Sequence, residues 1–167
     1  MDPQGQAEIL CRERQGQGRP AGEAVEGEEQ EKMTLQYSVA VRNARLDAIE
    51  TTIGTSPILE IRSGPPPANC AAPDQGTVLA TLNLPSDWMA PAANGVKVMA
   101  GTWQDLSADA TGQAGHFRIK DSTGTVCHIQ GTITDTNGDG DMKVDNINFA
   151  AGQQFTITAF AISTGNA

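Results

Sequence analysis

Residues 135–146, which read DTNGDGDMKVDN, have the side-chain spacing that most resembles an ion site in this chain. Oxygen-bearing side chains occupy alternate positions at its start: Asp135, Asn137, Asp139 and Asp141. With Gly140 in sixth place, this is the opening spacing of an EF-hand calcium loop, which binds the cation through oxygens at alternate positions. The twelfth residue is Asn146, whose amide cannot replace the bidentate carboxylate that completes such a loop.

The flanks of this acidic stretch favour a turn over a calcium site. CHIQGTIT before it and MKVDNINF after it alternate as strands do, whereas an EF-hand loop lies between helices. Asn-Gly and Asp-Gly pairs at its centre are the strongest short-range signal of a β-hairpin. We therefore predict a hairpin turn at 135–141, whose acids could still attract a cation weakly.

Other reactive side chains lie in neighbouring strand candidates. His116 and His128 are predicted to point outward from adjacent strands, where they could bind a metal, but no committed third ligand accompanies them. Ordinary surface histidines are therefore the favoured interpretation. Cys127 precedes His128, and because adjacent strand residues point to opposite faces, these two cannot form a nucleophile–base pair. Cys127 is predicted to be a small core residue.

The three cysteines, Cys11, Cys70 and Cys127, do not make the even-numbered disulfide framework of a small secreted protein. Free thiols are favoured, and a bridge between Cys70 and Cys127 remains an open alternative. Phosphate-binding loops, serine elbows and zinc motifs are absent from the sequence. The chain is therefore predicted not to be an enzyme, with no catalytic, cofactor-binding or metal-binding residues.

Trp88 and Trp103 are the only two tryptophans, and they could stack on a sugar as in a carbohydrate-binding module. No polar cluster accompanies either ring, whereas ligand sites usually combine aromatic and polar side chains. The favoured interpretation is that each tryptophan plugs one edge of a small β-sandwich.

The composition suits one domain of short strands joined by many turns. The chain has 167 residues with 18 Gly and 9 Pro, and only 19% of its residues are charged. A net charge of −9 argues against a nucleic-acid partner, which would require clustered Lys and Arg. No apolar run approaches the roughly 20 residues that span a bilayer, so we expect a soluble protein with no membrane partner.

Residues 1–32 contain 8 acidic and 4 basic residues and little apolar surface, so they are predicted to be disordered or an added extension. A helix is predicted at 33–54, where Thr34 can cap the start and Gly54 the end. Apolar residues recur near helical spacing within it: Leu35, Val39, Leu46, Ile49 and Ile53. This amphipathic helix is expected to pack on its own sheet, with docking onto a neighbouring subunit as the alternative.

From residue 55 to the C-terminus, apolar and polar residues alternate with the period of strands. Seven strands are predicted: 58–62, 78–84, 96–100, 116–120, 125–134, 142–149 and 155–162. Val96 and Val98 are predicted to point inward, with Lys97 outward, and Phe117 and Ile119 are likewise assigned to the core. The predicted fold is all-β: an antiparallel, jelly-roll-like β-sandwich over 55–167, preceded by one amphipathic helix.

The motifs SGPPPANC, GTVLATL, SADATG followed by GHFRI, and AAGQ lie within residues 33–167. Together with the helix that runs into a Gly-bounded strand, they resemble a family of small proteins of tailed bacteriophages and prophages, encoded among virion structural genes. The resemblance implies a non-enzymatic structural component of the virion, in capsid decoration or in the tail or neck, assembled in the bacterial host cytoplasm. Its implied partners are copies of itself and other virion proteins, such as major capsid or tail subunits.

The resemblance carries over no catalytic residues. The runner-up function is a carbohydrate- or receptor-binding module of a phage tail tip that uses Trp88 or Trp103. A calcium-dependent adhesin comes third and an enzyme last.

Overall fold

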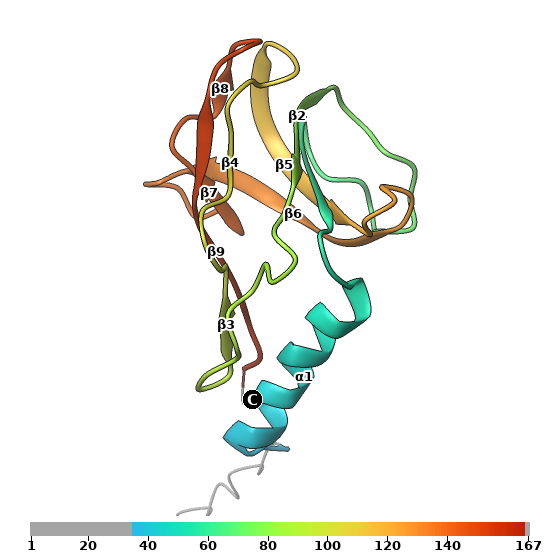
Figure 1. Cartoon of the computed structure of the whole chain (residues 1–167), viewed down its shortest axis with the longest axis vertical. Coiled ribbons are helices and arrows are strands. Elements are labelled where there is room, and N and C mark those ends of the chain that lie inside the picture. Colours follow the sequence, from blue (N-terminus) through green and yellow to red (C-terminus); the bar gives the residue numbers. More distant parts are fainter. Residues whose placement is uncertain (1–34, 166–167) are drawn as a thin grey trace, which may run out of the picture. The chain divides into compact units, whose positions relative to one another are not determined.

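Helix α1 (Val39–Ile53) opens the part of the chain that the structure describes, which is residues 35–165 of a computed structural model (Figure 1). It begins after Ser38, whose Oγ accepts a hydrogen bond from the Val41 amide at 3.3 Å, as an N-cap does. It ends at Gly54, which adopts a φ of +87° that favours glycine.

The predicted helix is confirmed in type, but its start is wrong. It begins at Val39 instead of residue 33, because Ser38 and not Thr34 is the capping residue. Thr34 and the predicted extension 1–32 lie outside the described residues. No helix among residues 35–165 has the length and apolar character required to cross a membrane.

The structure describes nine strands after α1. They are β1 (Ile58–Ser63), β2 (Val78–Asn83), β3 (Val96–Val98), β4 (Gln104–Asp105), β5 (Gly112–Lys120), β6 (Cys127–Asp135), β7 (Met142–Val144), β8 (Asn148–Phe149) and β9 (Phe155–Ser163). The predicted strand 142–149 is divided in two, because β7 pairs with β6 and β9 whereas β8 pairs with β5. The two-residue strand β4, which pairs with β9, is not predicted from the sequence.

The strands are hydrogen-bonded in the order β2–β1–β5–β6–β7–β9–β3, with β4 joined to β9 and β8 joined to β5. The sheet curls into a half-barrel (Figure 1). Its inward side chains form one hydrophobic core. The prediction of an all-β domain preceded by one helix is confirmed. Where an antiparallel sandwich was predicted, the strands form a single curled sheet. The sheet is mixed and not purely antiparallel, because β6 and β7 run parallel.

The predicted hairpin at 135–141 is wrong. Ile133 lies opposite Met142 and Asp135 opposite Val144, so β6 and β7 run in the same direction. After β6 the chain loops back, and β7 runs beside β6 in the same direction. Met142 and Val144 of β7 are therefore in the core, and β9 pairs with the other edge of β7. The Asn-Gly and Asp-Gly pairs provide a turn, but core packing determines which strands pair.

Strand β3 has the opposite face pattern from the predicted one. Lys97 exposes 2% of its surface, whereas Val96 exposes 39% and Val98 exposes 46%. The Lys97 Nζ lies 2.9 Å from an Asp47 oxygen and 2.8 Å from a Glu50 oxygen, both on α1. A buried ammonium requires such partners, so the ion pairs that attach β3 to α1 turn the two valines outward.

Candidate functional site

The outer face of β1 and β5 carries charged side chains that are nonetheless buried. Antiparallel pairing places Arg62 opposite His116 and Glu60 opposite Arg118, so these side chains share one face. His116, Arg118 and Lys120 expose between 0% and 5% of their surface, although the alternation predicts them to point into solvent. The predicted alternation is correct, but this face is covered.

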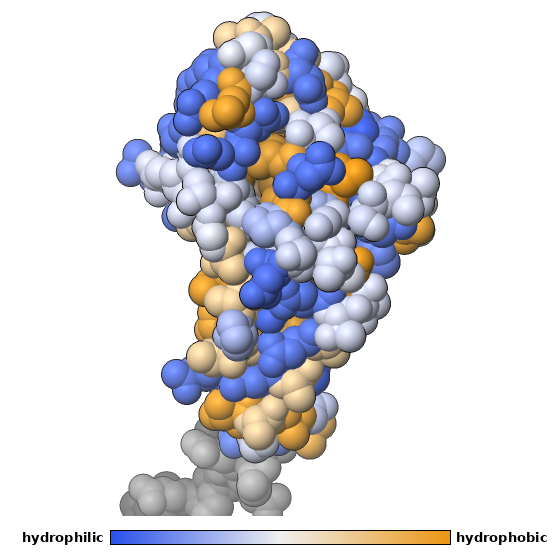
Figure 2. All heavy atoms as spheres, in the orientation of Figure 1, coloured by the Kyte–Doolittle hydropathy of each residue, from blue (hydrophilic) through white to orange (hydrophobic). Residues whose placement is uncertain are grey.

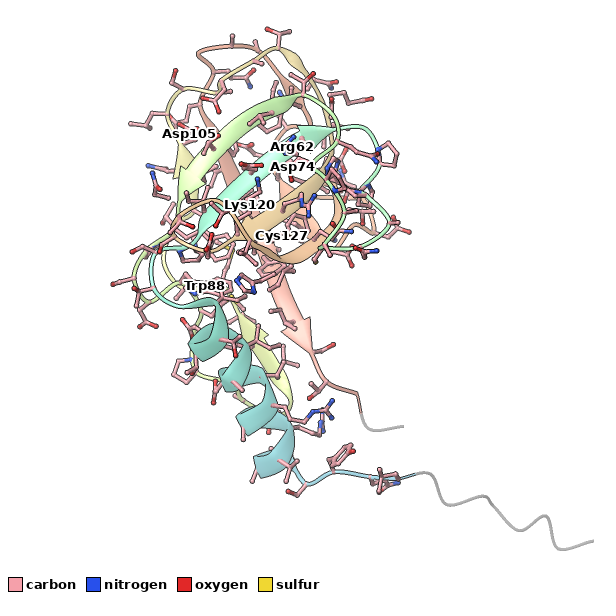
Figure 3. The ribbon with its side chains drawn as sticks, turned by 90° about the vertical axis from the view of Figure 1, so that its right-hand side faces the viewer. Arg62, Asp74, Trp88, Asp105, Lys120 and Cys127 are labelled. Atoms are coloured by element: carbon pink, nitrogen blue, oxygen red, sulfur yellow. The ribbon has the colours of Figure 1, made fainter. Side chains whose placement is uncertain are left out.

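The cover is the connection from β1 to β2, residues 64–77, hereafter the covering loop (Figure 3). Asp74 of this loop is the shared partner of three cations. Its Oδ2 lies 2.6 Å from Lys120 Nζ and 3.0 Å from Arg62 Nη2, and its Oδ1 lies 2.8 Å from Arg118 Nη1. Glu60 also pairs with Lys120 at 2.9 Å and with Arg62 at 2.8 Å. Three cations therefore share two carboxylates beneath the loop.

The three cations of this cluster lower the pKa of Asp74. Partial burial alone would raise that pKa, but the hydrogen bond from Lys120 and the nearby guanidinium groups of Arg62 and Arg118 lower it overall. Asp74 is thus held in its ionised form, which the three cations require.

Backbone carbonyl groups of the covering loop hold it at three further points. Arg118 donates to the Cys70 carbonyl at 2.6 Å and to the Ala72 carbonyl at 3.0 Å. Gln130 of β6 donates to the Pro67 carbonyl at 2.6 Å. The Pro-rich loop therefore obtains its hydrogen bonds from strand side chains, which is how an irregular segment can cover a polar face.

His116 and His128 do not form the metal pair that was weighed from the sequence. The register places His116 opposite Thr132, whereas His128 lies four residues before Thr132, near the start of β6. His116 is fully buried, and its Nδ1 lies 2.8 Å from the Gly64 carbonyl. Among residues 35–165 no group of three or more His, Cys, Asp or Glu side chains could hold a metal ion.

Burial of His116 leads to a pH-dependent stability. Burial lowers its pKa, as do the charges of Arg62 and Arg118, against the opposing effects of the Gly64 hydrogen bond and Asp74. Unfolded histidine has a pKa of about 6.5. Below that pH the unfolded chain binds the extra proton, so His116 should lower the free energy of unfolding by at most about 1.4 kcal/mol per pH unit.

Urea unfolding between pH 5 and 7.5 measures this effect. We expect the decline below pH 6.5 to be absent in His116→Gln and retained in the control His128→Gln. An unchanged decline in His116→Gln would contradict the assignment of the effect to His116.

Cys127 is not the core residue that its position in the sequence predicts. Ile119 pairs with Ile129 but Lys120 pairs with Cys127, so a bulge at His128 changes the register. Cys127 consequently lies on the face of Lys120 and Arg118, half-buried, and donates weakly from Sγ to the Ile129 carbonyl at 3.4 Å. It faces the covering loop instead of the core.

Within residues 135–141, where a turn was favoured over a calcium site, two of the acids are bound by the protein's own donors. The Asp135 Oδ1 accepts hydrogen bonds from the amides of Asn137 at 2.9 Å and Gly138 at 3.1 Å. The Asp141 Oδ2 accepts from the amide and hydroxyl of Thr132 at 2.8 and 2.9 Å. These carboxylates stabilise the turn between β6 and β7 and do not converge on one point.

Both tryptophans are buried, as the edge-plugging interpretation predicts. Trp88 exposes none of its surface and Trp103 exposes 1%, and their ring centroids lie 6.1 Å apart. The Trp88 indole donates to the Gly54 carbonyl at 3.2 Å, and the Trp103 indole donates to the Ala100 carbonyl at 3.0 Å. Neither ring is available as a stacking surface.

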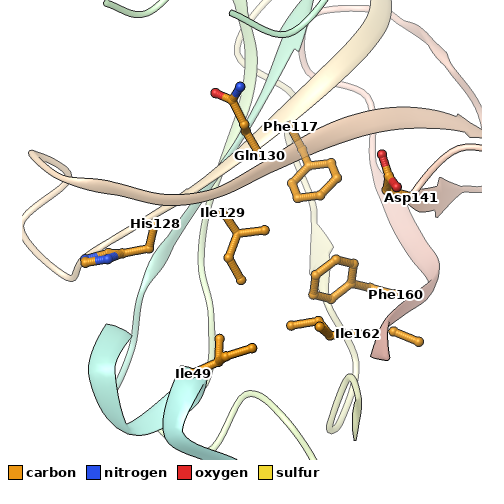
Figure 4. Close-up of a pocket in the computed structure, with 9 residues that line it drawn as sticks. Ile49, Phe117, His128, Ile129, Gln130, Asp141, Phe160 and Ile162 are labelled. Carbon is orange, nitrogen blue, oxygen red and sulfur yellow. The ribbon is translucent and has the colours of Figure 1, made fainter. Parts of the chain in front are cut away.

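A half-open cavity of about 310 Å³ lies between α1, β6 and β9 (Figure 4). Its apolar lining consists of Ile49, Phe117, Ile129, Phe160, Ala161 and Ile162. His128 and Asp141 stand at its sides (Figure 4). A cavity of this size and lining can accept an apolar side chain.

The chain matches no protein-family model, no curated protein and no solved structure. The charged cluster has its partners within the protein and holds the covering loop in place, whereas the cavity is mainly apolar.

Sequence reasoning missed the charged cluster as a unit. The sequence does place Arg118 and Lys120 at alternate positions of one predicted strand and Glu60 and Arg62 at alternate positions of another. The structure then pairs these two strands, so the four side chains share one face. Asp74 completes the cluster from the covering loop. Because the sequence does not predict the path of an irregular loop, the partners of Asp74 are seen only in the structure.

Proposed function

We propose that this protein is a non-enzymatic structural subunit of a tailed-phage particle, in capsid decoration or in the tail or neck. It acts through contacts with copies of itself and with other virion proteins. The observation that carries the proposal is a set of exposed apolar side chains where α1 begins and along β3. We call this set the apolar end: Leu35, Val39, Val41, Val96 and Val98.

Apolar residues just before α1 and in its first turn are left uncovered. Leu35 exposes 73% of its surface, Val39 exposes 47% and Val41 exposes 43%, whereas Leu46 and Ile53 are buried. Figure 2 shows apolar side chains at the bottom of the described region, where α1 begins in Figure 1. Of the two interpretations of the helix, docking onto a neighbouring subunit accounts better for these residues.

The apolar end is held rigidly for such a contact. The Arg42 Nε donates to the Thr164 carbonyl at 2.8 Å, and the Asn43 Oδ1 accepts from the Gly95 amide at 2.8 Å. With the Lys97 ion pairs, these bonds join α1 to β3 and to the end of β9. A surface that is already ordered loses less entropy when a partner binds.

The free energy gained by covering the apolar end is small for one contact and suits an assembly of many copies. Covering the exposed part of each of these side chains would contribute on the order of 1 kcal/mol. Five such contributions are close to the lower limit of about 4 kcal/mol that association costs. One contact is therefore weak, and stable binding requires repetition around a symmetric assembly.

The double variant Val39→Asp/Val41→Asp tests the apolar end as an assembly surface. Acidic residues are favourable in the first turn of a helix, so α1 should remain folded. Sedimentation velocity should show concentration-dependent multimers for the unaltered protein and monomers for the variant, with unchanged circular dichroism.

Leu106→Asp is the matched control, because Leu106 is 67% exposed but lies outside α1 and β3. It should assemble as the unaltered protein does. Monomers of the unaltered protein at every concentration, or normal assembly of the double variant, would contradict the proposed surface.

The alternative function, a carbohydrate- or receptor-binding module, has less support. Its proposed stacking residues, Trp88 and Trp103, are both in the core. A glycan would have to bind through other residues, and the calcium-dependent adhesin lacks converging carboxylates at 135–141.

A further inference from the structure

Cys70 and Cys127 come together in space although they are far apart in the sequence. Cys70 belongs to the covering loop and Cys127 begins β6. Both are free thiols and both are half-buried. Arg118 of β5 binds the Cys70 carbonyl at 2.6 Å, and Cys127 lies opposite Lys120 on the same face of β5, so both cysteines lie over one part of this face. The Cys70 thiol is also close enough to the Cys127 thiol to raise its pKa. The bulge in β6 produces this arrangement, because it turns Cys127 from the core toward the loop.

The surrounding structure holds the two cysteines in place without any help from the sulfur atoms. Arg118 binds the Cys70 carbonyl at 2.6 Å, and backbone pairing of β5 with β6 places Cys127 opposite Lys120. On either side of Cys70, the carbonyls of Pro67 and Ala72 are bound by Gln130 and Arg118. The approach of the thiols is therefore a consequence of how the covering loop is anchored.

We propose that Cys70 and Cys127 form an intramolecular disulfide when the folded protein meets a small disulfide oxidant, such as oxidised glutathione. One thiolate attacks the glutathione disulfide, which releases one glutathione thiolate and leaves a mixed disulfide on the protein. The second cysteine thiolate then attacks the protein sulfur of that mixed disulfide and releases the second glutathione. The protein loses two thiol protons and two electrons, and the oxidant is reduced to two glutathione molecules.

The bond would join the covering loop to β6 above the charged cluster. Closing so long a loop of chain restricts the unfolded state, so the oxidised protein should unfold at a higher temperature, by roughly 10 °C. If the proposed virion function is correct, subunits assembled in a reducing cytoplasm would acquire this bond after release into an oxidising medium. The disulfide itself does not depend on that function.

The rate of the reaction should depend on pH. Burial raises the pKa of the Cys127 thiol and the neighbouring Cys70 raises it further, although Arg118 opposes both effects. Because the thiolate is the attacking species, oxidation should be slow at neutral pH and faster near pH 9.

The test uses the full chain with Cys11→Ser, which removes the third thiol, incubated with oxidised glutathione at about pH 8.5. We expect an intact mass lower by two hydrogen atoms, a linked peptide pair containing Cys70 and Cys127, and the higher unfolding temperature. With Cys127→Ser added, the chain should instead retain glutathione on Cys70 and show no such rise. Reaction in urea should be much slower, because the fold brings the thiols together.

Two results would overturn the proposal. One is complete alkylation of both thiols after oxidation, and the other is a bond between chains, seen as a dimer on a non-reducing gel. Because the readouts are intramolecular, they differ from a failure of assembly at the apolar end.

Discussion

Replacing Trp103 with alanine is expected to lower the free energy of unfolding by about 3–5 kcal/mol, the range for loss of a large buried aromatic side chain. Trp103 exposes 1% of its surface, and its ring centroid lies 6.1 Å from that of Trp88 and 5.6 Å from that of Phe160. Its own carbonyl accepts from the Ile157 amide of β9 at 2.8 Å. The substitution would leave a cavity between these elements.

Urea unfolding followed by Trp88 fluorescence measures the loss. Trp103→Phe should lower stability less, since it keeps an aromatic ring, and Leu106→Ala at an exposed site should change stability by less than about 0.5 kcal/mol. Nearly unchanged stability of Trp103→Ala would contradict a core role. If that variant also lost glycan binding, the carbohydrate-binding alternative would regain support.

Replacing Asp74 with asparagine should produce the second large effect. It removes the carboxylate that Arg62, Arg118 and Lys120 share, and leaves Glu60 as the acid paired with two of these three cations. Breaking a fully buried ion pair costs about 3–5 kcal/mol. Because Asp74 is about one third exposed, we expect a smaller loss, of about 2–3 kcal/mol.

Release of the covering loop is the structural sign of this loss. Hydrogen exchange at residues 64–77 should become faster in Asp74→Asn, while Asp139→Asn, a control at an exposed acid, should leave it unchanged. The pKa of Asp74 is lowered in the folded protein, so its contribution is present above about pH 3.9 and lost as pH falls through the folded value. Unchanged exchange and stability would contradict this role of Asp74 and would show that Glu60 is a sufficient partner for the cluster.

The local pattern of the sequence predicts much of this fold. Six of the seven predicted strands are single strands of the structure. Successive side chains of a strand point to opposite faces, so a strand with one buried face shows alternating apolar and polar residues in the sequence. Burial of Trp88 and Trp103 agrees with the edge-plugging interpretation, which suits a domain in which only 4% of the residues are aromatic. These features are set by neighbouring residues, which a single sequence displays directly.

Other features depend on contacts between distant segments. Val96 and Val98 point outward because Lys97 meets acids of α1, and the alternation of β3 fits either face equally well. His116 is buried because a loop from elsewhere covers its face, and β7 runs parallel to β6 because β9 packs beside it. Tertiary contacts override the local signal in each case.

Cys127 illustrates the limit most clearly. Strict alternation places it in the core with Ile129, but one bulge in β6 moves it to the opposite face. A register change of one residue reverses the side to which a side chain points. The proposed disulfide with Cys70 depends on that single irregularity, which no sequence period displays.

We propose that this protein is a building block of a phage particle and that it binds its neighbours through the apolar end. Electron cryomicroscopy of particles purified from the bacterial host tests it most directly. We expect symmetric copies of the curled β domain on the shell, neck or tail, with Val39 and Val41 buried against a neighbouring subunit. Particles that contain no copy of the chain, or copies whose α1 faces solvent throughout, would contradict it.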